Sequence, residues 1–137
     1  MYVLDTNVVS ELRKAGRADA NVVAWATAVA PGTLYISAIT VLELELGILS
    51  LERRDKTQGA ILRVWMQRHV LPAFEGRILP VDTAVALQCA HLHVRDRRAE
   101  RDALIAATAI VHGMTVVTRN VGDFQGTGAT LVDPWVQ

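Results

Sequence analysis

The sequence predicts an α/β fold in which helices cover a parallel sheet of about five strands. Short apolar runs alternate with longer helix-periodic stretches, which is typical of parallel sheets with crossover helices. Residues 114–117 are nearly all apolar, as expected of a central parallel strand. Residues 102–111 form a helix that is apolar almost all round, and such a helix lies deep against a sheet. The 137 residues fit a single domain, 1–137, because a chain of this length can bury a self-sufficient core.

The short apolar runs are the expected strands, and the longer stretches between them are the expected helices. In chain order, the strands cover residues 2–4, 34–36, 78–81, 115–118 and 130–132. The helices cover residues 8–14, 19–29, 38–54, 57–70, 83–95 and 102–111.

Helix breakers and caps set the expected boundaries. The second helix ends before Pro31 and the fourth before Pro72, because proline does not continue a helix. Ser37 can cap the third helix, where apolar residues recur at three- and four-residue spacing and so form a buried stripe. Asp82 or Thr83 caps the fifth helix in the same way.

Composition and charge narrow the function classes. Hydrophobic residues make up 51% and charged residues 20%, which is globular and excludes a disordered chain. The formal net charge is zero, whereas a dedicated nucleic-acid binder usually carries a basic excess. Basic residues still gather in two regions, either as polyanion contacts or as solvated helix surface. They are Arg53, Arg54, Lys56, Arg63 and Arg68 in the first region, and Arg95, Arg97, Arg98 and Arg101 in the second.

Cysteine and histidine suggest no metal site. Cys89 is the only cysteine, so there is no internal disulfide, and no Cys/His spacing is typical of zinc. His91 and His93 lie on different sides of a helix and are interpreted as structural. No apolar run has the length of a membrane span, and the first residues lack the features of a signal peptide. The expected location is therefore the cytoplasm.

Four acidic residues map to one edge of the predicted sheet. Asp5 follows the first strand, and Glu43 lies in the early turns of the helix after the second. Asp102 opens the helix before the fourth strand, and Asp123 lies in the loop after that strand. Ligands of parallel sheets bind at this edge. Clustered carboxylates repel each other unless a cation neutralises them, so the pattern predicts an all-oxygen Mg²⁺ or Mn²⁺ site and metal-assisted phosphodiester cleavage.

Each acid also has a structural interpretation. Helix caps are possible at Asp5, Asp82 and Asp102. Glu43 has capping-box spacing from Thr40, and the fourth acid can shape a turn. Asp82 shares the same edge, so geometry alone does not exclude it from the site. Glu45 is two residues from Glu43, projects to another side of the helix and is left out.

Four segments around these acids form an ordered pattern. They are residues 3–12 (Val-Leu-Asp-Thr-Asn-Val-Val-Ser-Glu-Leu), 37–44 (Ser-Ala-Ile-Thr-Val-Leu-Glu-Leu), 102–109 (Asp-Ala-Leu-Ile-Ala-Ala-Thr-Ala) and 118–124 (Thr-Arg-Asn-Val-Gly-Asp-Phe). In this order they resemble the motifs of PIN-domain ribonucleases, and especially of VapC-type toxins of the FitB-like group. Four ordered motifs are far more specific than any one of them.

The resemblance implies a three-layer α/β/α PIN-like domain that cleaves RNA with one or two Mg²⁺ or Mn²⁺ ions. It implies that Asp5 and Asp102 bind metal directly. Glu43 and Asp123 would bind it directly or through water and orient the nucleophile. Polar side chains would support the carboxylates or the scissile phosphate. These are Asn7, Thr118 and Asn120, and Asn7 could equally be a helix cap.

The same resemblance implies partners. VapC-type toxins are held inactive by a VapB-type antitoxin that covers the acidic cleft, and four carboxylates would favour a basic side chain there. The family commonly forms homodimers. Candidate contact residues, which could equally pack in the core, are Val22, Val23, Trp25 and Ala26 on one helix and Ile61, Val64 and Trp65 on another.

Other function classes fit less well. A phosphatase or receiver-like domain would use Asp5 as nucleophile or phosphoacceptor. The phosphatase pattern requires an aspartate where Asn7 stands, and both require a late lysine, whereas Lys14 and Lys56 are the only lysines and both are early. A non-catalytic PIN-like binding module would be favoured by loss of an acid, but all four are present. A structure-specific DNA nuclease usually carries extra acids and insertions. Single-stranded or looped RNA is the expected substrate.

Overall fold

The computed structural model describes residues 1–136 and has a parallel sheet at its centre. Its strands are β1 (Tyr2–Leu4), β2 (Leu34–Ser37), β3 (Ile78–Leu79), β4 (Thr115–Val117) and β5 (Leu131–Val132). The order across the sheet is β3-β2-β1-β4-β5, and all neighbouring strands are parallel. β1 is therefore central, with Val3 in register with both Tyr35 and Val116. This sheet confirms the predicted fold class.

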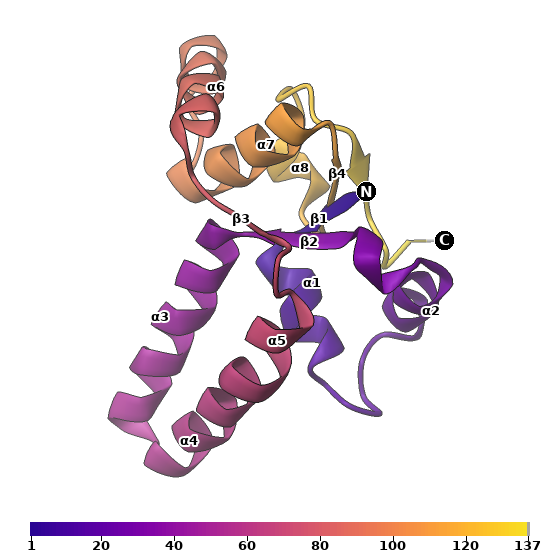
Figure 1. Ribbon diagram of the computed structural model, residues 1–137, viewed down its shortest axis with the longest axis vertical. Coiled ribbons are helices and arrows are strands. Elements are labelled where there is room, and N and C mark those ends of the chain that lie inside the picture. Colours follow the sequence, from indigo (N-terminus) through magenta and orange to yellow (C-terminus); the bar gives the residue numbers. More distant parts are fainter. Residues whose placement is uncertain (137) are drawn as a thin grey trace.

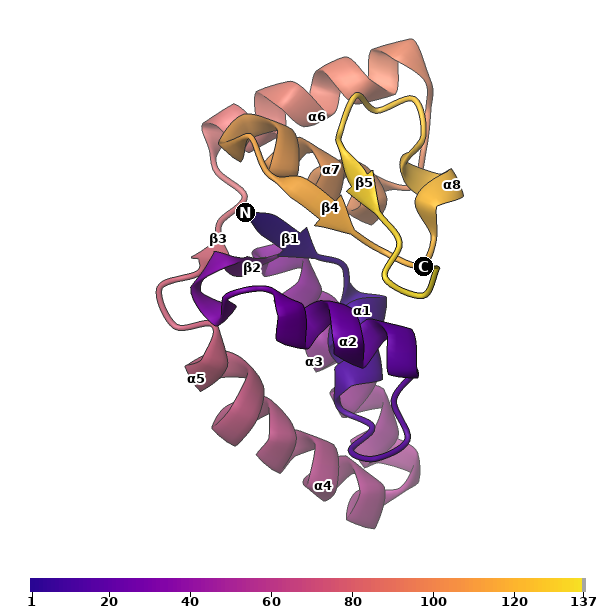
Figure 2. The same cartoon turned by 90° about the vertical axis from the view of Figure 1, so that its right-hand side faces the viewer.

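Helices cover both faces of the sheet and give three layers (Figures 1 and 2). In residues 1–136 they are α1 (Thr6–Leu12), α2 (Ala20–Ala28), α3 (Ala38–Arg54), α4 (Lys56–Trp65), α5 (Leu71–Ala73), α6 (Thr83–Arg95), α7 (Glu100–His112) and α8 (Val121–Phe124), with a 3-10 turn η1 (Pro31–Thr33) and a π turn η2 (Met66–Val70). α6, α7 and α8 lie on one face, and α1 to α5 lie on the other. Over these residues, no helix combines the length and apolar character that a membrane crossing requires.

Alternation along the central strands divides the core into two parts. Val3 and Val116 are wholly buried against α6 and α7. Leu4 and Val117, the next residues on the same strands, are wholly buried against α1 and α3. Successive side chains of a strand point to opposite faces, so two short strands supply both layers of the core.

Three predicted helix boundaries are wrong. The helix expected over 57–70 does not end before Pro72, because α4 continues through η2 into α5 and Pro72 occupies the first turn of α5. Proline is tolerated there because the π turn η2 has already shifted the backbone bonding, with the N–H of Leu71 donating to the carbonyl of Met66 five residues earlier. α1 begins at Thr6, two residues early, because Asp5 is its cap. α7 begins at Glu100, so Asp102 is its third residue and does not open it.

The candidate contact residues differ in their exposure. Val22 is wholly buried and belongs to the core, so it cannot contribute to a contact surface. Val23, Ile61 and Val64 are 40%, 55% and 48% exposed. Two of these three exposed candidates lie on α4, which forms with α3 a hairpin that extends away from the sheet (Figure 1).

Candidate active site

A cleft of about 430 Å³ opens where β1 ends and α7 begins. The cleft is lined by Asp5, Thr6, Asn7, Ser10, Glu43, Asp102 and Asn120. Three of the four predicted acids thus line one cleft, although they come from α3, α7 and the β1–α1 junction. Topology explains this, because the carboxyl ends of parallel strands and the amino ends of the covering helices meet at one edge.

Asp5 is both the cap of α1 and a carboxylate of the cleft. Its Oδ1 accepts a hydrogen bond from the backbone N–H of Thr6 at 2.8 Å. Its Oδ2 accepts from Thr118 Oγ1 at 2.8 Å and from Asn7 Nδ2 at 3.3 Å. The side chain is only 6% exposed, and this burial raises the pKa of Asp5, although the hydrogen bonds from Thr118 and Thr6 oppose the rise. Nearby charges on Glu43 and Asp123 raise the pKa further.

The polar residues predicted as support connect β1 to β4. Asn7 lies inside α1 and is not its cap. Its Oδ1 accepts a hydrogen bond from the backbone N–H of Arg119 at 3.3 Å, just past the end of β4. Thr118 is wholly buried, and its hydroxyl accepts from the backbone N–H of Asn120 at 3.0 Å. These bonds join the ends of two neighbouring strands around one carboxylate.

Glu43 is held by a threonine that the sequence did not single out. Thr6 Oγ1 donates to Glu43 Oε1 at 2.7 Å, and it also lies 3.2 Å from Thr40 Oγ1. The capping-box interpretation of Glu43 is wrong, because Ser37 caps α3 through the backbone N–H of Ile39 and Thr40 is wholly buried. Glu43 is thus free of a capping role and faces the cleft.

The pKa of Asp102 departs furthest from its ordinary value among the acids of the cleft. Its pKa is raised to about 6, first by burial and then by the charges of Asp5, Asp123 and Glu43. The cap interpretation is wrong here, because the cap position of α7 is Ala99. The three other acids are therefore each close enough to disfavour ionisation of Asp102.

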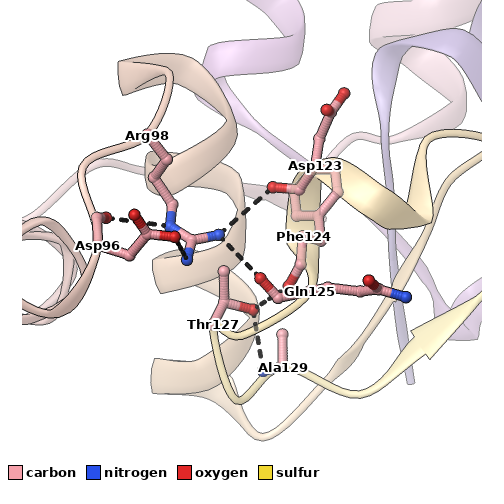
Figure 3. Close-up of polar contacts among 7 residues, drawn as sticks. All are labelled: Asp96, Arg98, Asp123, Phe124, Gln125, Thr127 and Ala129. Carbon is pink, nitrogen blue, oxygen red and sulfur yellow. Dashed lines mark hydrogen bonds and ion pairs between the residues drawn. The ribbon is translucent and has the colours of Figure 1, made fainter.

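Asp123 lies in α8, a short helix that the sequence did not predict, and not in a loop. Arg98 clamps this helix from the connection between α6 and α7 (Figure 3). Its Nη1 donates to the backbone carbonyls of Asp123 and Gln125 at 3.5 and 3.1 Å. Thr127 Oγ1 donates to the Phe124 carbonyl at 2.7 Å and closes the next turn. The Asp123 carboxylate is exposed and points away from the guanidinium (Figure 3).

The two basic regions do not form one polyanion surface. Arg63 bridges α3 and α4, with Nη1 2.6 Å from Glu45 Oε1 and Nη2 3.0 Å from Glu52 Oε1. Arg98 is committed to the α8 clamp. Arg101, by contrast, is 52% exposed and places Nη1 3.7 Å from Glu43 Oε2 at the edge of the cleft. Arg101 directly precedes Asp102 on α7 and so brings a positive charge to the edge of the cleft.

The two other acids considered from sequence lie outside the cleft. Asp82 caps α6 by accepting a hydrogen bond from the backbone N–H of Val85 at 3.0 Å. Glu45 is held by Arg63 on another side of α3. Sequence reasoning also missed Thr6 and Ser10, which lie one helical turn apart after Asp5 and line the cleft. Their spacing from Asp5 was the available signal.

The cleft has the chemistry of a divalent-cation site. Its donors are carboxylate, amide and hydroxyl oxygens, the ligands that Mg²⁺ and Mn²⁺ prefer. A dication would relieve the repulsion that raises the pKa of Asp102, so the residues present fit such an ion.

Comparison with known proteins agrees with this geometry. The sequence profile of the PIN domain matches residues 2–127. The VapC ribonuclease Y4jK of Sinorhizobium fredii is 39% identical over 140 residues, covering 98% of this chain and 98% of that protein. The toxin FitB of Neisseria gonorrhoeae is 38% identical over 140 residues, covering 98% of this chain and 99% of FitB.

The fold comparison extends over the whole chain. The crystal structure of FitAcB from Neisseria gonorrhoeae matches it with a TM-score of 0.90 at 37% identity, covering 100% of both chains. Profile, full-length relatives and fold agree with the four ordered motifs. The chain therefore belongs to the PIN-domain family, and within it to the group of VapC and FitB toxins.

Proposed function

We propose that this chain is a metal-dependent endoribonuclease toxin of a toxin–antitoxin module. The observation that carries the proposal is the crowding of carboxylates, which together with burial raises the pKa of Asp102 to about 6. Strongly perturbed acids in a cleft are typical of functional sites. RNA as the substrate is supported by the full-length similarity to a VapC ribonuclease.

Asp5 and Asp102 would hold Mg²⁺ or Mn²⁺ directly, and Glu43 and Asp123 would bind one or two ions directly or through water. When bound, the ion would make a coordinated water more acidic and offset the charge of the phosphate. Asp123 lies on the short helix α8, whose backbone carbonyls accept hydrogen bonds from Arg98. Its place therefore depends on the Arg98 clamp on α8.

The chain's own hydrogen bonds hold two of the carboxylates, those of Asp5 and Glu43, in position before any ligand arrives. Asp5 has both oxygens engaged and is 6% exposed, which suits a fixed ligand and argues against the rival use of Asp5 as a phosphotransfer nucleophile. Thr6 fixes one oxygen of Glu43, and the other faces Arg101. Arg101 would exchange this carboxylate for a phosphate oxygen when the cation takes its place.

The substrate would be a single-stranded or looped segment of RNA. An in-line attack requires that the scissile phosphate reach the carboxylates in the cleft, and a splayed backbone allows this more readily than a regular helix. Action on RNA implies a cytoplasmic site of activity.

A cognate VapB-type antitoxin would cover the cleft and the hollow beside it. This hollow shares Thr6 and Glu43 with the acidic cleft and runs along α3 past Ile48. It shares Arg13 and Trp65 with an apolar cavity next to α1. An antitoxin segment with a basic side chain at one end and apolar side chains at the other would match this sequence of surfaces.

We also propose a homodimer, with exposed apolar side chains of α4 as contact candidates. Ile61 and Val64 are about half exposed. Light scattering on the purified chain and on Ile61→Glu tests this, since a charge at the contact should shift the dimer toward monomer.

The test compares the wild-type chain with Asp5→Asn and Asp82→Asn on a labelled pool of total RNA. Mg²⁺ or Mn²⁺ is added or removed with chelator. The wild type and Asp82→Asn should make the same discrete metal-dependent cuts, because asparagine still caps α6 and Asp82 lies outside the cleft. Asp5→Asn should make none. Cuts that persist in Asp5→Asn would refute the site, and no cutting by metal-loaded wild type on any RNA class would favour the binding-module alternative.

A further inference from the structure

A second group of metal-ligating side chains lies outside the acidic cleft, between α6 and α7. Cys89 and His93 are one helical turn apart on α6, and Glu100 is the first residue of α7. One thiol sulfur, one imidazole nitrogen and one carboxylate oxygen all lie within 4.8 Å of one another. Cys89 Sγ is 4.0 Å from Glu100 Oε1, and His93 Nε2 is 3.4 Å from Glu100 Oε2.

The nitrogen of His93 is the observation that points to a ligand. Nε2 is buried, yet among residues 1–136 no hydrogen-bond partner reaches it. Its contact with Glu100 at 3.4 Å lacks the alignment of a hydrogen bond. Buried polar atoms almost always have a partner, and an unsatisfied one destabilises the fold. A cation bound between the three side chains would supply that partner.

We propose that Cys89, His93 and Glu100 form a zinc site that ties α6 to α7. Thiolate, imidazole and carboxylate together are typical zinc ligands, whereas Mg²⁺ takes oxygen ligands. The ligand set therefore separates this site from the acidic cleft. Zinc bonds of about 2.0–2.3 Å in tetrahedral geometry place ligand atoms roughly 3.3–3.6 Å apart. The three ligand atoms lie within 4.8 Å of one another, so they would have to approach by about 1 Å at most for the ion to bind.

The surroundings of the site give a charged ion access from solvent. They also leave room for a fourth ligand. Cys89 is 4% exposed, whereas the Glu100 side chain is 72% exposed, so the site opens to solvent on the Glu100 side. His93, Arg97, Arg98 and Glu100 border a surface hollow there. The thiolate and the carboxylate together offset the charge of Zn²⁺. The neighbouring guanidinium groups would favour water or a small anion as the fourth ligand.

Zinc at this site would affect the acidic cleft through α7, the helix that carries both Glu100 and Asp102. Glu100 precedes Asp102 by two residues in the first turn of the same helix. An ion that joins Glu100 to α6 would stiffen the turn that presents Asp102 to the cleft.

The experiment titrates Zn²⁺ into the untagged, chelator-stripped full chain and follows binding by calorimetry and by the thermal unfolding midpoint. Co²⁺ serves as a spectroscopic substitute, because its thiolate charge-transfer band reports on Cys89. Ligand variants are Cys89→Ser, His93→Gln and Glu100→Gln. Matched controls are His91→Gln, an exposed imidazole on the same helix, and Asp5→Asn in the other cleft.

Wild type and His91→Gln should bind Zn²⁺ with a raised unfolding midpoint and a cobalt–thiolate band. Asp5→Asn should lose only the zinc that the acidic cleft binds and should keep the band, because the band reports on Cys89 alone. Each ligand variant should lose at least tenfold in affinity, and Cys89→Ser should lose the band. Circular dichroism without metal shows whether the buried-site variants fold, and Glu100→Gln keeps the test decisive if they do not, because its side chain is exposed. Zinc binding that is the same in the ligand variants as in wild type, or a cobalt–thiolate band that is lost in Asp5→Asn or absent in wild type, would overturn the proposal.

Discussion

Replacing Asp102 with asparagine should stabilise the metal-free protein while it abolishes metal-dependent cleavage. The amide has nearly the shape of the carboxylate but carries no charge, so the variant removes the cost of burying a charge and the repulsion from the other acids. A stabilising change at a residue required for activity would show that the cleft is folded at an electrostatic cost.

The size of the effect follows from the raised pKa of Asp102. A rise from the ordinary value of 3.8 to about 6 corresponds to about 3 kcal/mol of unfavourable free energy in the ionised folded state. Asp102 is partly exposed, and solvent screens the charges. We therefore expect the variant to gain about 1–2 kcal/mol at pH 8, or roughly 3–10 °C in the unfolding midpoint.

The gain should depend on pH in a defined direction. The unfolded chain ionises this carboxyl near pH 3.8, whereas the folded protein does so near pH 6. Between these values the folded protein holds more protons, so the contribution of Asp102 to stability falls as the pH rises. The advantage of Asp102→Asn should be full above about pH 7, shrink as the pH falls through 6 and vanish below 3.8.

The assay is urea unfolding of both proteins in chelator from pH 4 to pH 8, with Asp82→Asn as control. The control should stay within about 0.5 kcal/mol of wild type at every pH, because asparagine also caps helices well. Added Mn²⁺ should raise the midpoint of wild type and leave that of Asp102→Asn nearly unchanged. A variant that is equally or less stable than wild type at pH 8 would refute the reasoning.

Three further predictions concern packing and support of the site. Gly59→Ala should lower the free energy of unfolding in urea by about 2 kcal/mol, because the added Cβ would lie 2.7 Å from a backbone Cα of the preceding helix. Gly47→Ala has nothing within 4 Å of the added Cβ and should raise the free energy of unfolding by about 0.5–1 kcal/mol. A gain at both positions would contradict the close approach at Gly59. Arg98→Gln should lower cleavage roughly tenfold and speed hydrogen exchange in α8, and Arg97→Gln should change neither; unchanged exchange in Arg98→Gln would exclude the clamp. Thr118→Val should lower Mn²⁺ affinity roughly 10–100-fold in calorimetry, since it removes a buried donor to a metal carboxylate, and unaltered affinity would exclude that role.

Much of the fold follows from local pattern. α3 covers residues 38–54 as predicted, because Ser37 supplies a cap and the apolar stripe is long and regular. The predicted strands are present because apolar runs between breakers leave few alternatives. Pro72 shows the limit of such rules, since the π turn η2 before it changes the backbone bonding and lets the helical run continue past a proline. α8 has four residues, too few for any periodicity to predict it.

The fold class could be predicted from the sequence, and so could the four acids proposed for the site, because strand pattern, helix caps and ordered motifs are encoded locally. The interactions among these residues arise only in the folded structure. It brought Thr6 to Glu43 across 37 positions, Thr118 to Asp5 across 113 and Arg98 to the carbonyls of α8. It also gave Cys89 and His93 a third partner at Glu100, which depends on how α7 folds back on α6. Such contacts depend on side-chain packing in three dimensions, and no local spacing specifies it.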